Sequence, residues 1–202
     1  MQILLWILAA LLGYLLGSIN AAIIITKIFL HSDVRAQGSH NAGTANVARV
    51  FGPWIGLATL VLDILKTIAA LALGNLLLGA PGIAIACLGC LAGHCWPMFF
   101  QFRGGKGVAV TAGIALYLDW RVFLVLLVVY VFAFLLLRTA SIASLSGVTL
   151  LPAAMALFGG FTIWHYIAAC AGVAVVWVMH RGNLSRLFHG EENKFNFQQK
   201  SK

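Results

Sequence analysis

The stretch at residues 51–78, FGPWIGLATLVLDILKTIAALALGNLLL, contains only two charged side chains, Asp63 and Lys66. A helix needs about 20 predominantly apolar residues to cross the hydrocarbon core of a bilayer. The stretch is therefore predicted to be a transmembrane helix. Similar apolar runs occur at residues 4–25, 121–137, 141–158 and 162–179.

Two more apolar segments lie between residues 81 and 118, separated by a short basic loop. The second, 108–118, is too short to span the hydrocarbon unaided. Either the bilayer thins there or the loop dips inward, and irregular backbone at depth is tolerated only within protein or beside a wet cavity. We therefore predict an all-α, polytopic membrane protein with seven transmembrane helices and a recessed site.

The composition agrees with this fold class. Of the 202 residues, 62% are hydrophobic and 9% are charged, whereas soluble domains carry about 25% charged residues. The net charge of +8 resides in short loops and not on a polar face, so membrane topology explains it better than a nucleic-acid partner does. The N-terminus lacks a basic region and is interpreted as a retained first span. Residues 1–192 are expected to form one membrane domain, followed by a polar, mobile tail at 193–202.

The basic residues also predict the orientation. With seven spans, one face receives almost all of them, and the loops of the opposite face receive only Arg121. Because basic loops stay in the cytoplasm, the N-terminus is expected outside and the C-terminus inside. The residues on the inner face are Lys27, Arg35, Arg49, Arg103, Lys106, Arg138, Arg181, Arg186, Lys194, Lys200 and Lys202.

All four cysteines fall in apolar segments. Cys87 and Cys90 form a CxxC pair, but their helical setting argues against a redox or zinc site. We interpret them, together with Cys95 and Cys170, as small buried hydrophobes. No metal site is predicted.

The loop FRGGKGV at residues 102–108 sets two cations among three glycines. Glycine lets backbone N–H groups converge, and Arg103 and Lys106 supply countercharge, so the loop suits a phosphate. An ordinary cytoplasmic loop would explain the charge but not the glycines. It is not a Walker A motif, because Gly107 stands where Ser or Thr should follow the lysine. Nearby His94 is interpreted as a structural hydrogen-bond partner in preference to a base.

Two further segments of the inner face are richer in polar groups than topology requires. Residues 38–49, GSHNAGTANVAR, combine small residues and side-chain amides at the start of a helix, a favourable seat for an anion. Helix capping in an interfacial loop is the alternative. Residues 180–192, HRGNLSRLFHGEE, either close over a charged substrate or bind anionic lipid. Leu184, Leu187 and Phe188 there predict a short amphipathic helix on the membrane surface.

Asp63 and Lys66 lie three residues apart and therefore on one helix face. Each costs roughly 2.5–3.5 kcal/mol at a helix centre on insertion scales, so they must pair or line a cavity. A structural ion pair and a role in a site remain equally open. Gly13 and Gly17 form a small-xxx-small pattern that predicts close helix packing, while Ser18 and Asn20 are candidates for the same interior.

Together these segments resemble the bacterial acyl-phosphate-dependent glycerol-3-phosphate acyltransferases, the PlsY family, over nearly the whole chain. GHCWPMFFQFRGGKGVA at residues 93–109 is close to the family pattern GHxxPxxxxFxGGKGVA. Residues 38–49 are similar to GSGNxGATNxxR, residues 180–192 to HRxNxxRLxxGxE, and Asp63 with Lys66 to DxxK. The departures are Asn20, where the family pattern GSIPxG has Pro, and in the first loop His40, Ala42, Thr44 and Ala45. The last four concern the fine geometry of the first loop and not its role.

The resemblance implies transfer of a fatty acyl group from acyl phosphate, and not from acyl-CoA, to glycerol 3-phosphate. It implies an active site on the cytoplasmic side of the bacterial inner membrane, no cofactor, and functional coupling to an enzyme that produces acyl phosphate. By the same analogy the glycerol phosphate would sit on the loop at residues 104–107. The implied catalytic residues are Ser39, Arg49, Lys106, His180 and Asn183. The implied phosphate-binding residues are Asn41, Gly43, Asn46, Arg103, Gly104, Gly105, Gly107 and Arg181. The implied supporting residues are Asp63, Lys66, His94 and Glu192.

The histidine pattern limits the mechanism. Acyltransferases that use acyl-CoA carry a His followed five residues later by Asp, and no histidine of this chain satisfies that spacing. We therefore expect an oxygen of the substrate phosphate, or His180, to take the proton of the acceptor hydroxyl. Ser39 would hydrogen-bond the reacting groups without forming an acyl-enzyme.

Two other classes of protein are alternatives. A transporter for phosphate-bearing metabolites also suits recessed cationic loops, but no internal repeat occurs and every polar motif falls on one side. A lipid-binding scaffold fits the recessed glycine loop poorly.

Overall fold

The computed structural model describes residues 1–195, and these form helices and loops without any strand. The prediction of an all-helical fold is confirmed for these residues. The α-helices are α1 Gln2–Ser18, α2 Ala21–Phe29, α3 Thr44–Phe51, α4 Pro53–Leu78, α5 Ala80–Cys95, α6 Val108–Leu118, α7 Trp120–Leu137, α8 Ala140–Thr149, α9 Leu151–Phe158, α10 Ile163–Met179 and α11 Arg181–Phe188; two short 3-10 helices are η1 Val34–Ala36 and η2 Met98–Phe100.

Within residues 1–195, five segments are long and apolar enough to cross a membrane: 2–29, 53–78, 80–100, 120–137 and 140–158. A sixth arises if α10 and α11, bent by 52° at His180, count as one span. Helix α6, at residues 108–118, is apolar but too short by the same standard. The structure thus supports five to six spans, and the number seven and the orientation stay predictions.

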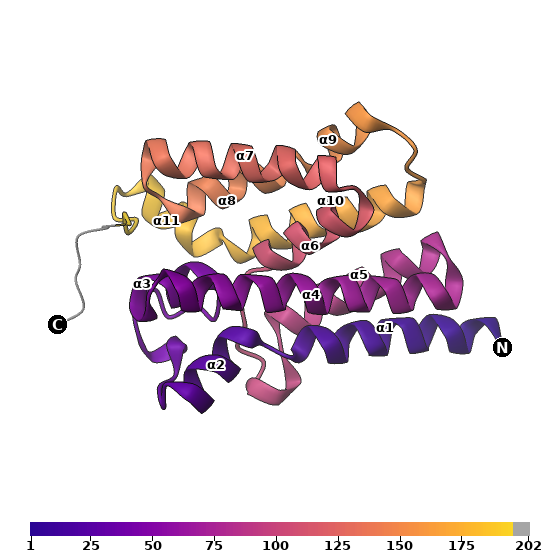
Figure 1. Ribbon diagram of the computed structural model, residues 1–202, viewed down its shortest axis with the longest axis horizontal. Coiled ribbons are helices and arrows are strands. Elements are labelled where there is room, and N and C mark those ends of the chain that lie inside the picture. The colour runs from indigo at the N-terminus through magenta and orange to yellow at the C-terminus, as the bar shows by residue number, and fades with distance from the viewer. Residues whose placement is uncertain (196–202) are drawn as a thin grey trace.

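The first apolar run is not one straight helix. It breaks after Ser18, and α2 turns away from the axis of α1 (Figure 1). Asn20 begins α2, its side-chain oxygen accepting a hydrogen bond from the N–H of Ile23 at 3.1 Å. This is the N-cap interaction that starts a helix. The expected run of 4–25 therefore extends to Phe29 with a polar break inside it.

Helices α1 and α5 pack through their glycines. A Cβ added at Gly13 would lie 2.4 Å from the carbonyl oxygen of Ala86, and one at Gly17 would lie 2.3 Å from that of Cys90. Such backbone contact is possible only without side chains at the crossing. The small-xxx-small prediction is confirmed, and it brings the end of α1 close to α5.

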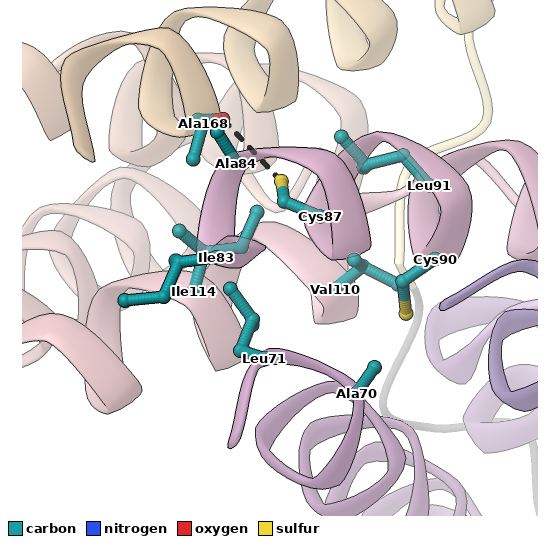
Figure 2. Packing of buried hydrophobic residues seen from close by; sticks show 10 residues of the cluster. All are labelled: Ala70, Leu71, Ile83, Ala84, Cys87, Cys90, Leu91, Val110, Ile114 and Ala168. Carbon is teal, nitrogen blue, oxygen red and sulfur yellow. Dashed lines mark hydrogen bonds between the residues drawn. The ribbon is translucent and has the colours of Figure 1, made fainter. Parts of the chain in front are cut away.

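The core lies where α4, α5, α6 and α10 meet (Figure 2). Its buried members are Ala70, Leu71, Ile83, Ala84, Cys87, Cys90, Leu91, Val110, Ile114 and Ala168. The thiol of Cys87 donates to the carbonyl oxygen of Ala168 at 3.6 Å, and Cys95 is buried as well. The expectation for Cys170 was wrong, since it is exposed. Two positions after Ala168, it lies on the opposite side of α10 because a helix has 3.6 residues per turn.

Two of the three polar motifs lie at one end of the molecule, with α3 and α11, and the helix after the glycine loop lies further in (Figure 1). In Figure 1, α2, α3 and α11 lie at the end opposite the N-terminus, and α6 lies in the middle of the long axis. The short helix predicted around residues 184–188 is present as α11 Arg181–Phe188, and its place on the membrane surface stays a prediction. The predicted tail begins with described residues: the N–H of Phe195 donates to the carbonyl oxygen of Arg138 at 2.7 Å. The rest of it, 196–202, lies outside the described residues.

Candidate active site

A cavity of about 220 Å³ opens between the first loop, the loop before α6, and α11. Most of the residues that the sequence singles out line it, although they come from segments more than 100 positions apart. They are Ser39, Asn41, Gly43, Asn46, Arg49, Asp63, His94, Lys106, His180, Asn183 and Glu192. The remaining predicted site residues do not line it: Lys66, Arg103, Gly104, Gly105, Gly107 and Arg181.

Lys106 is one of the cations that line this cavity. Its ammonium donates a short hydrogen bond to the side-chain oxygen of Asn183 on α11. Burial lowers the pKa of Lys106 to about 8, against the opposing effect of Glu192. The ammonium has a neutral direct partner, so its charge is available to an anion.

Glu192 connects the polar segment at residues 180–192 to the rest of the molecule. Its carboxylate accepts hydrogen bonds from the amide of Asn183 at 2.5 Å, the hydroxyl of Ser141 at 2.8 Å and the guanidinium of Arg186 at 2.8 Å. Burial raises the pKa of this carboxyl, but the three donors outweigh burial and leave it lowered. Glu192 therefore orients Asn183, which in turn holds Lys106.

Asn46 holds the first loop in place. Its amide donates to the carbonyl oxygens of Val34 at 3.0 Å and Gln37 at 2.9 Å, and its oxygen accepts from the N–H of Ser39 at 2.8 Å. Both donors of the amide are thus used within the loop. Although Asn46 lines the cavity, we assign it the positioning of Ser39 and not the phosphate contact that the sequence suggested.

The start of α3 faces the same cavity. Gly43 precedes the helix, and Thr44 and Ala45 form its first turn and line the cavity. The first N–H groups of a helix have no partner within it and favour negative charge. Arg49, one turn further on, also lines the cavity, and its guanidinium lies 5.1 Å from the ring centre of Phe195. Burial lowers the pKa of Arg49, with Glu192 acting in the opposite sense.

The glycine loop is recessed against α5. The N–H groups of Gly104 and Gly105 donate to the carbonyl oxygens of Cys95 and His94, at 3.1 and 3.0 Å. These two groups are therefore not free for a phosphate, contrary to the sequence-based picture. Gly107 adopts a left-handed backbone with φ 84° and begins α6. The first turn of α6 is thus the second helix N-terminus at the cavity, through Val108 and Ala109.

Arg103 and Arg181 do not contribute to the cavity wall. Both are exposed, and Arg181 is the first residue of α11. The carbonyl oxygen of Arg103 accepts a hydrogen bond from Arg35 at 3.2 Å, and that of Phe100 accepts one at 2.8 Å. Arg35 is itself held by Asp33, at 2.8 Å. Its guanidinium, which the sequence marked only as a topological charge, fastens the first loop to the glycine loop.

Asp63, Lys66 and His94 form a buried cluster beneath the cavity. The Lys66 ammonium lies 2.7 Å from a carboxylate oxygen of Asp63 and 3.1 Å from Nδ1 of His94. It also donates to the carbonyl oxygens of Gly17 at 3.1 Å and Ile19 at 2.7 Å. Of the two roles that the sequence left open, the ion pair is present, and Asp63 also lines the cavity. It joins α4 to the broken end of α1 and to α5.

His180 stands at the bend between α10 and α11. Its Nδ1 donates to the carbonyl oxygen of Val176 at 2.7 Å, because a carbonyl can only accept. In the neutral ring this leaves Nε2 as an acceptor. Since His180 lines the cavity with Ser39, this geometry suits a group that takes a proton.

The far part of the cavity is apolar. Helix α4 contributes Leu60 and Ile64, and α7 contributes Phe123, Leu126 and Tyr130. A site that joins an apolar wall to a few polar groups suits an amphipathic ligand. Ser141 and Arg186 also line the cavity and were not predicted as site residues. Ser141 carries no sequence signal, and Arg186 was noted only as part of its basic segment. Within residues 1–195 no group of three or more metal-ligating side chains occurs.

Comparisons with known proteins point in one direction. Residues 7–190 match the family model described as glycerol-3-phosphate acyltransferase. The chain is 36% identical over 189 residues to the glycerol-3-phosphate acyltransferase of Thermoanaerobacter sp. (strain X514), covering 93% of this chain and 94% of that one. It is 38% identical to that of Mesorhizobium japonicum, covering 93% and 95% of the two chains.

The structural comparison agrees. The crystal structure of PlsY, an integral membrane glycerol 3-phosphate acyltransferase, in its glycerol 3-phosphate form has a TM-score of 0.85 and 31% sequence identity, with 96% of each chain covered. The lysophosphatidic acid form of PlsY gives 0.84 and 30%, with 95% of each chain covered.

Proposed function

Because this chain belongs to the glycerol-3-phosphate acyltransferase family, we propose that it transfers a fatty acyl group from acyl phosphate to the sn-1 hydroxyl of glycerol 3-phosphate. The products would be lysophosphatidate and inorganic phosphate, at the first step of phospholipid synthesis. Membership of the family supports an acyltransferase acting on glycerol 3-phosphate. The acyl-phosphate donor and the position of acylation are the parts that we propose.

One observation carries the proposal: a single cavity joins two helix N-termini and the cations Arg49 and Lys106 to an apolar wall. The N-termini belong to α3 and α6, and a third lining cation, Arg186, is paired with Glu192. Each N-terminus with its cation suits one phosphate. Both proposed substrates carry a phosphate, and the acyl chain of the donor matches the apolar side. An acyl-CoA donor would bring a nucleotide for which the sequence offers no recognisable motif.

The chemistry needs positioning and charge stabilisation more than covalent help. The sn-1 oxygen attacks the acyl carbonyl carbon, and the bond from that carbon to the phosphate oxygen breaks, so phosphate leaves with the electron pair. The hydroxyl proton goes to a phosphate oxygen or to Nε2 of His180. Arg49 and Lys106 stabilise the negative charge of the leaving phosphate. Effects of this kind are often the largest single contribution to a rate.

The other polar residues hold the reactants. Ser39 donates its hydroxyl to the reacting groups, with its backbone fixed by Asn46. Asn183 orients Lys106 and is fixed by Glu192. No step is assigned to an acyl-serine, and neither a cofactor nor a metal ion is invoked.

The proposed setting follows from the same reasoning. The enzyme would be a multi-pass protein of the bacterial inner membrane with the cavity facing the cytoplasm, where glycerol 3-phosphate is dissolved. The acyl phosphate would reach the apolar wall from the lipid, and an enzyme that makes acyl phosphate would supply it.

The test uses purified protein in detergent with glycerol 3-phosphate and either acyl phosphate or acyl-CoA. We expect equal amounts of lysophosphatidate and inorganic phosphate from acyl phosphate alone. Product from acyl-CoA, or none from either donor, would overturn the proposed donor. Uptake of glycerol 3-phosphate into proteoliposomes without product would favour a transporter instead.

A further inference from the structure

Lys66 has more hydrogen-bond acceptors around it than an ion pair requires. Besides Asp63, its ammonium contacts Nδ1 of His94 at 3.1 Å and the carbonyl oxygens of Gly17 and Ile19. The side chain is 7% exposed and that of His94 is 3% exposed. Bulk water therefore neither screens these contacts nor competes for them.

These contacts favour one tautomer of His94 over the other, even though the carboxylate of Asp63 lies 3.8 Å from the same Nδ1. An ammonium has three N–H donors and no acceptor. Nδ1 of His94 can face it at 3.1 Å only as an acceptor, because an N–H at that position would oppose the donors of Lys66. A neutral imidazole with an unprotonated Nδ1 carries its proton on Nε2. The proton on Nε2 is therefore held there by the buried charge on the neighbouring helix.

Nε2 of His94 lies at the junction of the two loops that line the cavity. A Cβ added at Gly105 would lie 2.2 Å from Nε2 and 2.9 Å from the carbonyl oxygen of Ala42. Any other residue at position 105 would therefore cover the edge of the imidazole. His94 lines the cavity from the last turn of α5, and its carbonyl oxygen accepts a hydrogen bond from the N–H of Gly105 at 3.0 Å.

We propose that Nε2–H of His94 donates a hydrogen bond to an oxygen of the phosphate of the bound acceptor, and that Lys66 is the positioning residue that keeps the proton on Nε2. The naming of the acceptor rests on the proposed function. The donor role replaces the backbone N–H groups of Gly104 and Gly105, which α5 already engages. His94 is then a substrate-binding residue that remains neutral throughout the reaction.

The first test reads the tautomer directly. In protein labelled with ¹⁵N-histidine, the resonances of His94 are assigned by their loss in His94→Gln. We expect a neutral ring with the proton on Nε2, and a saturable shift of that N–H on addition of glycerol 3-phosphate or inorganic phosphate. A proton on Nδ1, or no shift with either probe, would overturn the proposal.

The second test separates the two substrates. His94→Ala should raise KM for glycerol 3-phosphate roughly 10- to 100-fold, the loss expected for one hydrogen bond to a charged group, and change KM for the acyl donor less than about twofold. His94→Gln, which keeps an N–H donor, should recover part of the loss. His165→Gln is the matched control, because His165 caps the far end of α10. Equal changes in both KM values, or a change confined to the donor, would contradict the assignment.

The positioning role of Lys66 needs a variant that leaves no unpaired buried charge. In Lys66→Met with Asp63→Asn, both charges are removed together. We expect a folded protein in which His94 shows a mixture of tautomers and KM for glycerol 3-phosphate rises. An unchanged tautomer would remove Lys66 from the proposal. The shift of the His94 Nε2–H resonance on adding phosphate requires no turnover. It can therefore be present when the proposed acyl donor is wrong, and absent when that donor is right.

Discussion

The protein builds two polar clusters from similar parts, and they differ in how the lysine is paired. Beneath the cavity, Lys66 lies 2.7 Å from the carboxylate of Asp63, with carbonyl oxygens around it. At the cavity itself, Lys106 contacts the neutral amide of Asn183, and the carboxylate of Glu192 lies one hydrogen bond further away. The first lysine is neutralised by its neighbours and the second keeps its charge available.

The difference shows how a membrane protein separates support from binding. A buried charge in a membrane span must be paired, and the contacts that pair it hold neighbouring helices together. A charge at a cavity that receives an anion must not be paired directly, or the substrate would have to displace its partner. Placing an amide between Lys106 and Glu192 orients the ammonium without neutralising it. Four predictions test this contrast.

Lys66→Met alone should give the largest effect, on stability. It leaves the carboxylate of Asp63 buried without its partner, which typically costs about 3–5 kcal/mol. Thermal unfolding in detergent should show a large fall in Tm. The double variant with Asp63→Leu should recover most of it, whereas a stable single variant would mean that the pair is not buried as described.

Lys106→Ala should lower kcat/KM roughly 10²- to 10³-fold, the loss seen when one preorganised donor to a developing anion is removed. Its Tm should change little, because Lys106 contacts a neutral amide and no direct ionic partner. Initial rates of phosphate release measure the effect. Lys27→Ala is the control, since Lys27 is exposed in a surface ion pair with Asp33. Comparable losses in the two variants would argue against a special role for Lys106.

The fall of kcat/KM at alkaline pH should follow the deprotonation of Lys106. Burial lowers its pKa to about 8, and only the cation attracts phosphate. The value of kcat/KM should therefore be full well below pH 8, half its maximum near pH 8, and fall by about tenfold per pH unit well above it. Lys106→Arg should be less active but should not show this fall, because arginine stays protonated. A fall that persists in Lys106→Arg would belong to another group.

Phe195→Ala should give the smallest effect. Its ring lies 5.1 Å from the guanidinium of Arg49, and such a contact is worth about 0.5–1 kcal/mol at a partly exposed site. KM for one substrate should rise about two- to fivefold with kcat unchanged. Phe195→Tyr should behave as wild type. A large fall in kcat would mean that this segment takes part in the reaction.

Much of the architecture could be predicted because the membrane imposes length and polarity on each helix. The boundaries of α6 matched the 108–118 segment, and α11 appeared where the amphipathic spacing placed it. The break at Asn20 was not predicted. Hydropathy averages over a window and does not register one buried amide that starts a new helix. The exposure of Cys170 was missed for a related reason, since an apolar helix face looks the same whether it meets protein or lipid.

For the site, the sequence predicted some residues correctly and others not. Ser39, Arg49, Lys106, His180 and Asn183 do line one cavity. Asn46 and the N–H groups of Gly104 and Gly105 are engaged within the protein instead. The sequence identifies groups able to bind a phosphate. It does not say which of them are already hydrogen-bonded within the folded protein. Arg35 shows the converse, because its two carbonyl partners come from a loop about 65 positions away.

By itself, the sequence determined that the chain is helical, apolar and basic on its loops, since hydropathy and charge act locally along the chain. It also supplied the ordered motifs that mark the family. Only the tertiary structure decided which lysine is neutralised and which is available, and on which nitrogen His94 carries its proton. Those properties depend on distances between helices that are far apart in the chain, and such distances are set by packing.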